Sequence, residues 1–249
     1  MTSTALAPVA MNVPDFLRTP EFAEIAARFN AAVGGGIKAG GFARLGIKGG
    51  KFFLIDATQE PKERLITVAT DQGNLPAMAL DVVVVGGNPG ISKVFYAKKW
   101  EPGDDTEPDC SSDNGITPDA HIATPQSNAC ATCPKNAWGS KITDDGKEAK
   151  ACADNKRIAI IPVADLTHKP LGVQIPPASL KEFGLFTRSL DRAGAQIPIF
   201  AVVCRITFDA TVSYPKLKFA YARYLTKPEF DAVRERLDGD DIRAIVEPS

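Results

Sequence analysis

Four of the chain's five cysteines fall in a stretch that is almost free of aliphatic side chains. Residues 101–156, which contain them, are instead rich in Asp, Pro, Ser, Gly and Asn. A segment with so few apolar side chains cannot bury a hydrophobic core of its own. It therefore needs another source of stability, and a metal ion bound by cysteine is a common one in a reducing compartment.

The spacing of these cysteines is typical of a metal site. It reads Cys110-x19-Cys130-x2-Cys133-x18-Cys152, and the central pair places two thiolates on one turn, where both can bind the same tetrahedral ion. Two further thiolates close the coordination sphere, which is a structural rather than a catalytic arrangement. We expect Zn²⁺ as the cofactor, with an iron–sulfur cluster as the second candidate, because four thiolates hold either. His121 lies between the outer cysteines and is an alternative ligand to one of them.

The remainder of the chain consists mostly of short β-type runs. Runs rich in β-branched and aromatic residues, several of them alternating, predict six or seven strands. The four valines at 82–85 predict a strand that is buried on both faces. Helical periodicity predicts an amphipathic helix that begins near Pro177 and a short one in the run KPEFDAVRERL. We therefore expect a mainly β (α+β) fold with a cysteine-rich metal-binding insert and a few peripheral helices.

These patterns divide the chain into three parts. Residues 1–33 read as an N-terminal arm and helix, and residues 34–225 as the core, interrupted by the metal-binding insert at 101–156. Residues 226–249 read as a C-terminal helix and a mildly acidic tail. No apolar run approaches the roughly 18 residues of a membrane span, and no basic start leads into a long apolar run. We therefore expect a cytoplasmic protein with no membrane partner.

Basic and aromatic side chains alternate on both sides of the first cysteine and again near the end of the core. Lysines follow the phosphates of a single strand, and rings stack on its bases at about 1–3 kcal/mol each. Solvated lysines and core rings give the same pattern, and the acidic run EPGDDTEPD dilutes the first stretch. The candidate nucleic-acid contacts are Tyr96, Lys98, Lys99, Trp100, Lys135, Trp138, Lys141, Lys216, Lys218 and Tyr221.

Motifs of catalysis are missing from the sequence. It contains no P-loop, no G-x-G-x-x-G between a strand and a helix, and no G-x-S-x-G. The two histidines are far apart in the chain, so they do not form a paired-histidine metal motif. The net charge of −1 neither demands nor forbids nucleic acid. We expect a protein that is not an enzyme.

The run PDCSSDNGITPDA…PQSNACATCPKNAWGS…KACADNKRIAI resembles the zinc-bearing single-stranded DNA-binding proteins of tailed bacteriophages. The resemblance covers about residues 42–225 and is most specific around the cysteines. It implies an OB-type barrel, a five-stranded, partly open barrel whose face and loops bind oligonucleotides. It also implies a role in phage DNA replication or recombination in the host cytoplasm, with phage or host replication proteins as further partners.

By position, this resemblance makes the four clustered cysteines the metal ligands, and Tyr96, Trp100, Trp138 and the nearby lysines the DNA contacts. The chain departs from the pattern in two ways. The family's ligand set includes a histidine where this chain offers a fourth cysteine, and the family's strongly acidic tail is reduced here to DGDDIRAIVEPS. An alternative function is a zinc-module interaction factor that docks on a host replication or transcription protein, which the near-neutral charge and the acidic run beside Trp100 favour.

Overall fold

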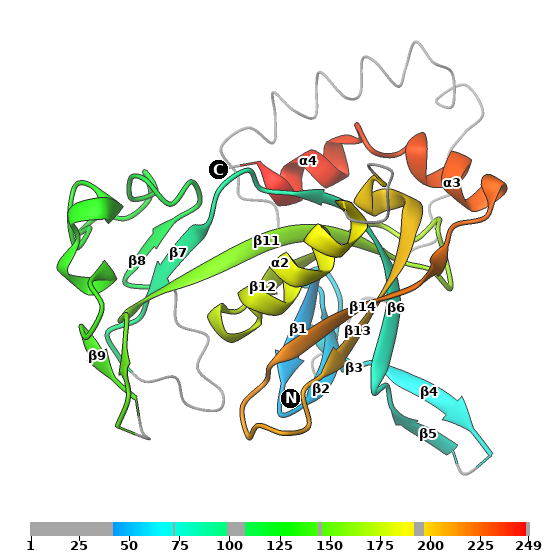
Figure 1. Cartoon of the computed structure of the whole chain (residues 1–249), viewed down its shortest axis with the longest axis horizontal. Coiled ribbons are helices and arrows are strands. Elements are labelled where there is room, and N and C mark those ends of the chain that lie inside the picture. Colours follow the sequence, from blue (N-terminus) through cyan, green and yellow to red (C-terminus); the bar gives the residue numbers. More distant parts are fainter. Residues whose placement is uncertain (1–41, 72, 99–107, 144–145, 192–196, 248–249) are drawn as a thin grey trace, which may run out of the picture. The chain divides into compact units, whose positions relative to one another are not determined.

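The computed structural model of the chain (Figure 1) describes residues 42–71, 73–98, 108–143, 146–191 and 197–247. The arm and helix expected at 1–33 lie outside these ranges, as do the candidate contacts Lys99 and Trp100. Residues Phe42–Ser249 form one compact unit, and the cysteine-bearing segment belongs to it. Among the described residues, no helix is both long and apolar enough to cross a membrane.

The fold is mainly β, with one ten-stranded sheet that curls into a half-barrel, and the described residues include three α-helices. The strand order is β14-β13-β6-β11-β12-β1-β2-β3, and every pair in it is antiparallel except β1 with β12. Its strands are β1 (Arg44–Lys48), β2 (Lys51–Ile55), β3 (Glu63–Leu65), β6 (Ala79–Gly87), β11 (Cys152–Pro162), β12 (Leu171–Ile175), β13 (Val202–Phe208) and β14 (Leu217–Tyr224).

Shorter elements complete the strand list. Strands β7 (Ser92–Phe95) and β8 (Cys110–Ser112) continue the sheet beside the first half of β11. Two separate hairpins are β4 (Thr67–Thr70) with β5 (Gly73–Pro76), and β9 (Lys141–Ile142) with β10 (Glu148–Ala149). The sequence analysis expected fewer strands because elements of two to four residues are too short to show a periodicity.

The long strand β11 connects the cysteine-bearing segment to the core. Its first four residues pair with β7, and its later residues lie between β6 and β12. The sequence changes character at the same point, from CADN to the apolar run that ends at Pro162. The residues at 158–161 are almost completely buried, because the sheet is covered on both faces there.

The two faces of the sheet carry separate clusters of apolar side chains. Successive side chains of a strand point to opposite faces, so Val82 and Val84 join one cluster while Val83 and Val85 join the other. Helix α2 (Pro177–Asp191) packs on the first face. Helices α3 (Lys227–Arg234) and α4 (Asp240–Val246) pack on the second. The prediction of a strand buried on both faces at 82–85 is confirmed.

Helix α4 occupies the residues in which the sequence analysis expected a mildly acidic tail. Asp240 and Asp241 stand in its first turn, where acidic side chains interact favourably with the helix dipole. Ile242 and Ile245, three residues apart and thus on one side of the helix, are buried against the sheet. The acidic residues of this region therefore begin a docked helix.

Replacing Ile245 with alanine tests the docking of α4. Its side chain is 0% exposed, so we expect Ile245→Ala to lower the free energy of unfolding by about 2–5 kcal/mol through lost burial and a residual cavity. Chemical denaturation measures this change. Arg243→Ala, on the exposed side of the same helix, is the control and should change stability by about 0.5 kcal/mol or less. Equal stabilities of the two variants would contradict the packing.

The capping box of α3 predicts a specific acid sensitivity. Hydrogen bonds from Arg223, and then from the backbone and hydroxyl of Thr226, lower the pKa of Glu229 from 4.5 to about 2. The folded-state pKa is depressed, so this stabilisation is present above pH 4.5 and is lost as the pH falls towards 2. We expect Glu229→Gln to flatten the stability curve in that window, as measured by denaturation at several pH values. A slope equal to that of wild type would refute the assignment, and Glu235→Gln is the control.

Candidate metal centre and adjoining groove

Two of the clustered cysteines lie on the outer strands of a short three-stranded ladder, one on each side of Phe95. Phe95 of β7 pairs with Cys152 of β11 on one side and with Cys110 of β8 on the other. Directly paired residues of neighbouring strands point to the same face of a sheet. The side chains of Cys110, Phe95 and Cys152 therefore share one face of the β11-β7-β8 ladder.

The other two cysteines come from a tight turn. Cys130 begins the 3-10 helix η2 (Cys130–Thr132), and Cys133 caps it by donating its backbone N–H to the Cys130 carbonyl at 3.3 Å. Pro134 then starts the 3-10 helix η3 (Pro134–Asn136), where a missing N–H costs nothing. All four cysteines line one small cavity with a volume of about 10 Å³, which is about the space that a single water molecule needs. The space is therefore suited to a single ion.

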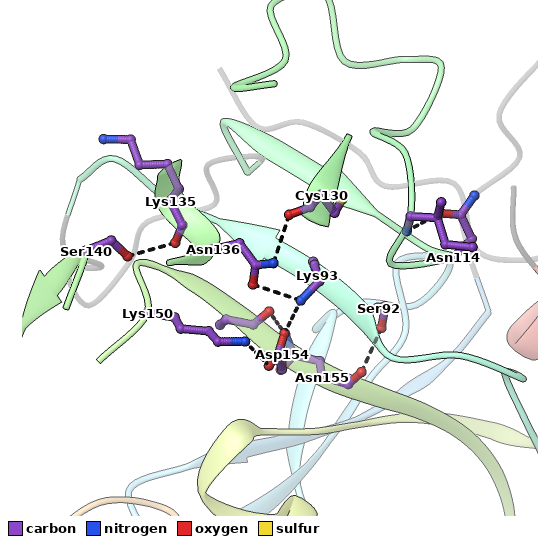
Figure 2. Close-up of polar contacts among 12 residues, drawn as sticks. Ser92, Lys93, Asn114, Cys130, Lys135, Asn136, Ser140, Lys150, Asp154 and Asn155 are labelled. Carbon is purple, nitrogen blue, oxygen red and sulfur yellow. Dashed lines mark hydrogen bonds and ion pairs between the residues drawn. The ribbon is translucent and has the colours of Figure 1, made fainter. Parts of the chain in front are cut away.

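A polar network that includes Lys93 and Asn136 of the cavity wall adjoins this cavity (Figure 2). The Lys93 ammonium, whose side chain is 12% exposed, forms an ion pair with Asp154 and donates a hydrogen bond of 3.0 Å to the Asn136 side-chain oxygen. The Asn136 amide nitrogen in turn donates to the Cys130 carbonyl at 2.8 Å. Lys150 pairs with the second Asp154 oxygen at 3.1 Å. The network thus connects the cysteine turn to the ladder.

The two lysines on the cavity wall favour the thiolate form of the cysteines. Burial raises the pKa of the Cys152 thiol to about 11, and the Lys93 ammonium opposes that shift. The Lys135 ammonium lies 5.2 Å from the centroid of the Phe95 ring, on the wall of the same cavity. A four-thiolate Zn²⁺ site carries two net negative charges, and two lysines on its wall would balance them.

The four cysteines at the cavity are a donor set that fits a four-thiolate ion. All five cysteines are free, and Cys152 interacts electrostatically with the other three at the cavity. In the described part of the chain, no three His, Cys, Asp or Glu side chains already stand as a metal-ligating group. A bound ion would therefore have to draw the thiols together. His121 is not on the cavity wall, where the residues are Cys110, Cys130, Cys133, Cys152 and their neighbours.

A larger groove lies on the opposite face of the same ladder. Its volume is about 780 Å³, and its walls include Val94 and Tyr96 from β7 and the loop that follows, and Ala153 and Asn155 from β11. These residues alternate along their strands with those that face the cysteine cavity. The far wall comes from β1, β2 and β12, and His121 also lines the groove.

The polar groups of the groove divide into paired and free ones. Arg157 forms an ion pair with Asp113, and Asp119 accepts hydrogen bonds from the Ser111 hydroxyl at 2.6 Å and the Asp113 backbone at 2.7 Å. The Arg44 guanidinium, by contrast, has no hydrogen-bond or ion-pair partner among the described residues. The Tyr96 side chain is 49% exposed. A ring and a cation are therefore available to a ligand.

The sequence analysis missed Arg44 and Gln174 as groove residues. Each is a single exposed residue on a different strand, and neither stands in a motif. They come together because β1 and β12 pair in parallel, with Arg44 opposite Gly172. A parallel pair joins segments that are distant in the sequence, so only the topology could have indicated this part of the site.

The structure does not bring the predicted nucleic-acid contacts to one surface. Tyr96 lies in the groove, and Lys135 lies at the cysteine cavity. Lys216 pairs with Asp209 and Glu182, and Lys218 pairs with Asp209, so both charges are neutralised within the chain. The remaining described candidates are exposed: Lys98 after β7, Trp138 and Lys141 in the cysteine-bearing segment, and Tyr221, whose ring meets that of Tyr224 edge-on at 5.1 Å.

A scan of protein-family models and searches of curated proteins and of solved structures each found no match to this chain. The cavity and the groove are therefore the features from which a function can be inferred.

Proposed function

We propose that the chain is a non-enzymatic, sequence-tolerant single-stranded DNA-binding protein that acts in phage DNA replication or recombination. The groove beside the cysteine cavity is the observation that carries this proposal. Its open position on a curled, mainly β sheet supports an OB-like mode of binding, in which a strand lies across the sheet. Its volume of about 780 Å³ is that of a small-ligand site, so it would hold a short segment of the strand.

The chemistry of the groove suits a single strand better than a duplex. The exposed Tyr96 ring can stack on an unpaired base, and the free Arg44 guanidinium can contact a phosphate. Asp113 and Asp119 balance much of the positive charge of the groove. We therefore propose that stacking contributes more to affinity than phosphate contacts do.

We also propose that Zn²⁺ is a structural cofactor of this protein, bound by Cys110, Cys130, Cys133 and Cys152. Four thiolates around an ion-sized cavity, with Lys93 and Lys135 on its wall, support this assignment. When bound, the ion would supply cross-links between the turn and the ladder in a segment with few apolar side chains. No open coordination position remains for catalysis.

Alanine variants of the groove test the DNA-binding proposal. We expect Tyr96→Ala to weaken binding of a labelled dT oligonucleotide by about 1–3 kcal/mol, the usual loss for one stacked base. Arg44→Ala should weaken binding and make it less dependent on salt. Fluorescence anisotropy at several salt concentrations measures both effects, and the wild-type slope of log K against log salt should be shallow, between about −0.7 and −1.4 for one or two phosphate contacts.

The control for these variants is Tyr224→Ala, which removes an equally exposed ring at the far end of β14. A Tyr96→Ala, Arg44→Ala double variant that binds dT as tightly as wild type would exclude the groove. Absence of binding by the wild type at low salt would exclude the function.

The alternative of a protein-docking module has one observation in its favour. Ile116, Trp138 and Ile142 are all exposed in the cysteine-bearing segment, and Trp138 is 71% exposed. Exposed apolar side chains in one segment are typical of a surface that meets another protein. Failure to bind dT, together with a phage or host replication protein captured through Trp138, would select this alternative.

Metal analysis of cysteine variants tests the zinc proposal. We expect one Zn²⁺ per wild-type chain by elemental analysis, and loss of most of it in Cys133→Ser, with faster proteolysis of residues 108–156. Cys204→Ala removes the one cysteine that lies outside the cavity, in β13, and should retain the metal. Visible absorption by the purified protein would favour an iron–sulfur cluster, and a metal-free wild type would exclude the cofactor.

A further inference from the structure

We propose that Lys93 is a positioning residue of the metal site, which acts through Asn136 to hold the Cys130–Cys133 turn against the ladder that carries Cys110 and Cys152. This inference rests on the zinc part of the proposed function. Its physical basis is that the four thiols come from two separate backbone segments, the ladder and the turn. A four-coordinate ion requires both pieces to face one point, and the protein must hold them there.

Asn136 contacts both ends of the cysteine turn. Its backbone N–H donates to the Cys133 carbonyl at 3.0 Å, and its side-chain nitrogen donates to the Cys130 carbonyl at 2.8 Å. The remaining polar atom of this side chain, the oxygen, accepts from the Lys93 ammonium at 3.0 Å. The orientation of the Asn136 amide is thus fixed by Lys93 on one side and by the turn on the other (Figure 2).

Lys93 belongs to the ladder and is anchored there. It stands on β7 directly opposite Asp154 of β11, and its ammonium pairs with that carboxylate. Its side chain points to the same face as Phe95 two residues later, which is the face of the cysteine cavity. One ammonium group therefore connects the strand that begins with Cys152 to the turn that contains Cys130.

The near-burial of Lys93 also indicates a specific role. Taking an ammonium out of water is costly, and an apolar residue of similar size often stabilises a fold as well or better. Asp154 does not require Lys93 for its neutralisation, since Lys150 also pairs with it. What Lys93 adds beyond Lys150 is the hydrogen bond to Asn136.

This difference provides a matched pair of variants. Lys93→Met keeps the length of the side chain and leaves Asp154 paired with Lys150, but removes the connection to Asn136. Lys150→Met leaves Asp154 paired with Lys93 and keeps that connection. Loss of a residue that orients metal ligands typically weakens binding about 10–100-fold. We expect that loss in Lys93→Met and a change of less than about threefold in Lys150→Met.

Competition with a chromophoric chelator measures Zn²⁺ affinity, and the thiolate-to-metal absorption of Co²⁺-substituted protein reports the ligand geometry directly. Asn136→Ala should reproduce the effect of Lys93→Met. The double variant Lys93→Met, Asn136→Ala should be no weaker than either single variant, because both changes break the same connection. Full affinity in Asn136→Ala, or additive losses in the double variant, would overturn the proposal. Lys93→Arg, which keeps the charge and the donors, should recover part of the affinity.

A metal-free measurement separates this inference from the zinc proposal. Hydrogen exchange of the chelated protein should show faster exchange of the Cys133 and Asn136 amides in Lys93→Met than in Lys150→Met, because the turn is no longer held. Equal exchange in the two variants would overturn the inference even if zinc binds. A wild type that binds no zinc would exclude the cofactor, and the exchange data alone would then decide whether Lys93 holds the turn.

Discussion

The backbone hydrogen bonds of β11 hold the cysteine cavity and the groove in one frame. This strand pairs with β7 along its first four residues and with β6 and β12 along the rest. The apolar half is fixed by burial on both faces, and the polar half extends that rigid strand out of the core. A segment with few apolar side chains thereby gains a firm edge on which β7 and β8 can assemble.

Because successive side chains of a strand point to opposite faces, the β11-β7-β8 ladder has two different surfaces. Cys152, Lys93 and Phe95 point to one face, where they meet the cysteine turn, while Ala153 and Tyr96 point to the other, where they line the groove. Both faces are formed by the same three strands. A one-residue change of register in any strand would therefore move its side chains to the opposite face and alter both surfaces. The cysteine cavity and the groove are therefore positioned by the same hydrogen bonds.

Much of this arrangement could be predicted from the sequence, and the failures have physical reasons. The valines at 82–85, the helix that begins at Pro177 and the convergence of four cysteines follow from local patterns. The neutralisation of Lys216 and Lys218 by Asp209 could not be predicted, because it depends on how a loop folds back between two strands. Helix α4 was missed since its seven residues are too few to show a helical periodicity and its first turn is acidic. The free Arg44 became a groove residue only through a parallel strand pair.

Helix α4 also sets the order in which the core can be completed during synthesis. The cluster that contains Val83 and Ile161 is covered by Ile242 and Ile245, which the ribosome adds long after the strands themselves. Until those residues emerge, the central strands β6 and β11 have one face without its cover. Between the synthesis of β11 and that of α4, such a nascent chain exposes an apolar sheet surface to solvent and to chaperones. A protein fused after residue 246 would be synthesised while this face is still uncovered. The linker should therefore be long enough for α4 to pack against the sheet.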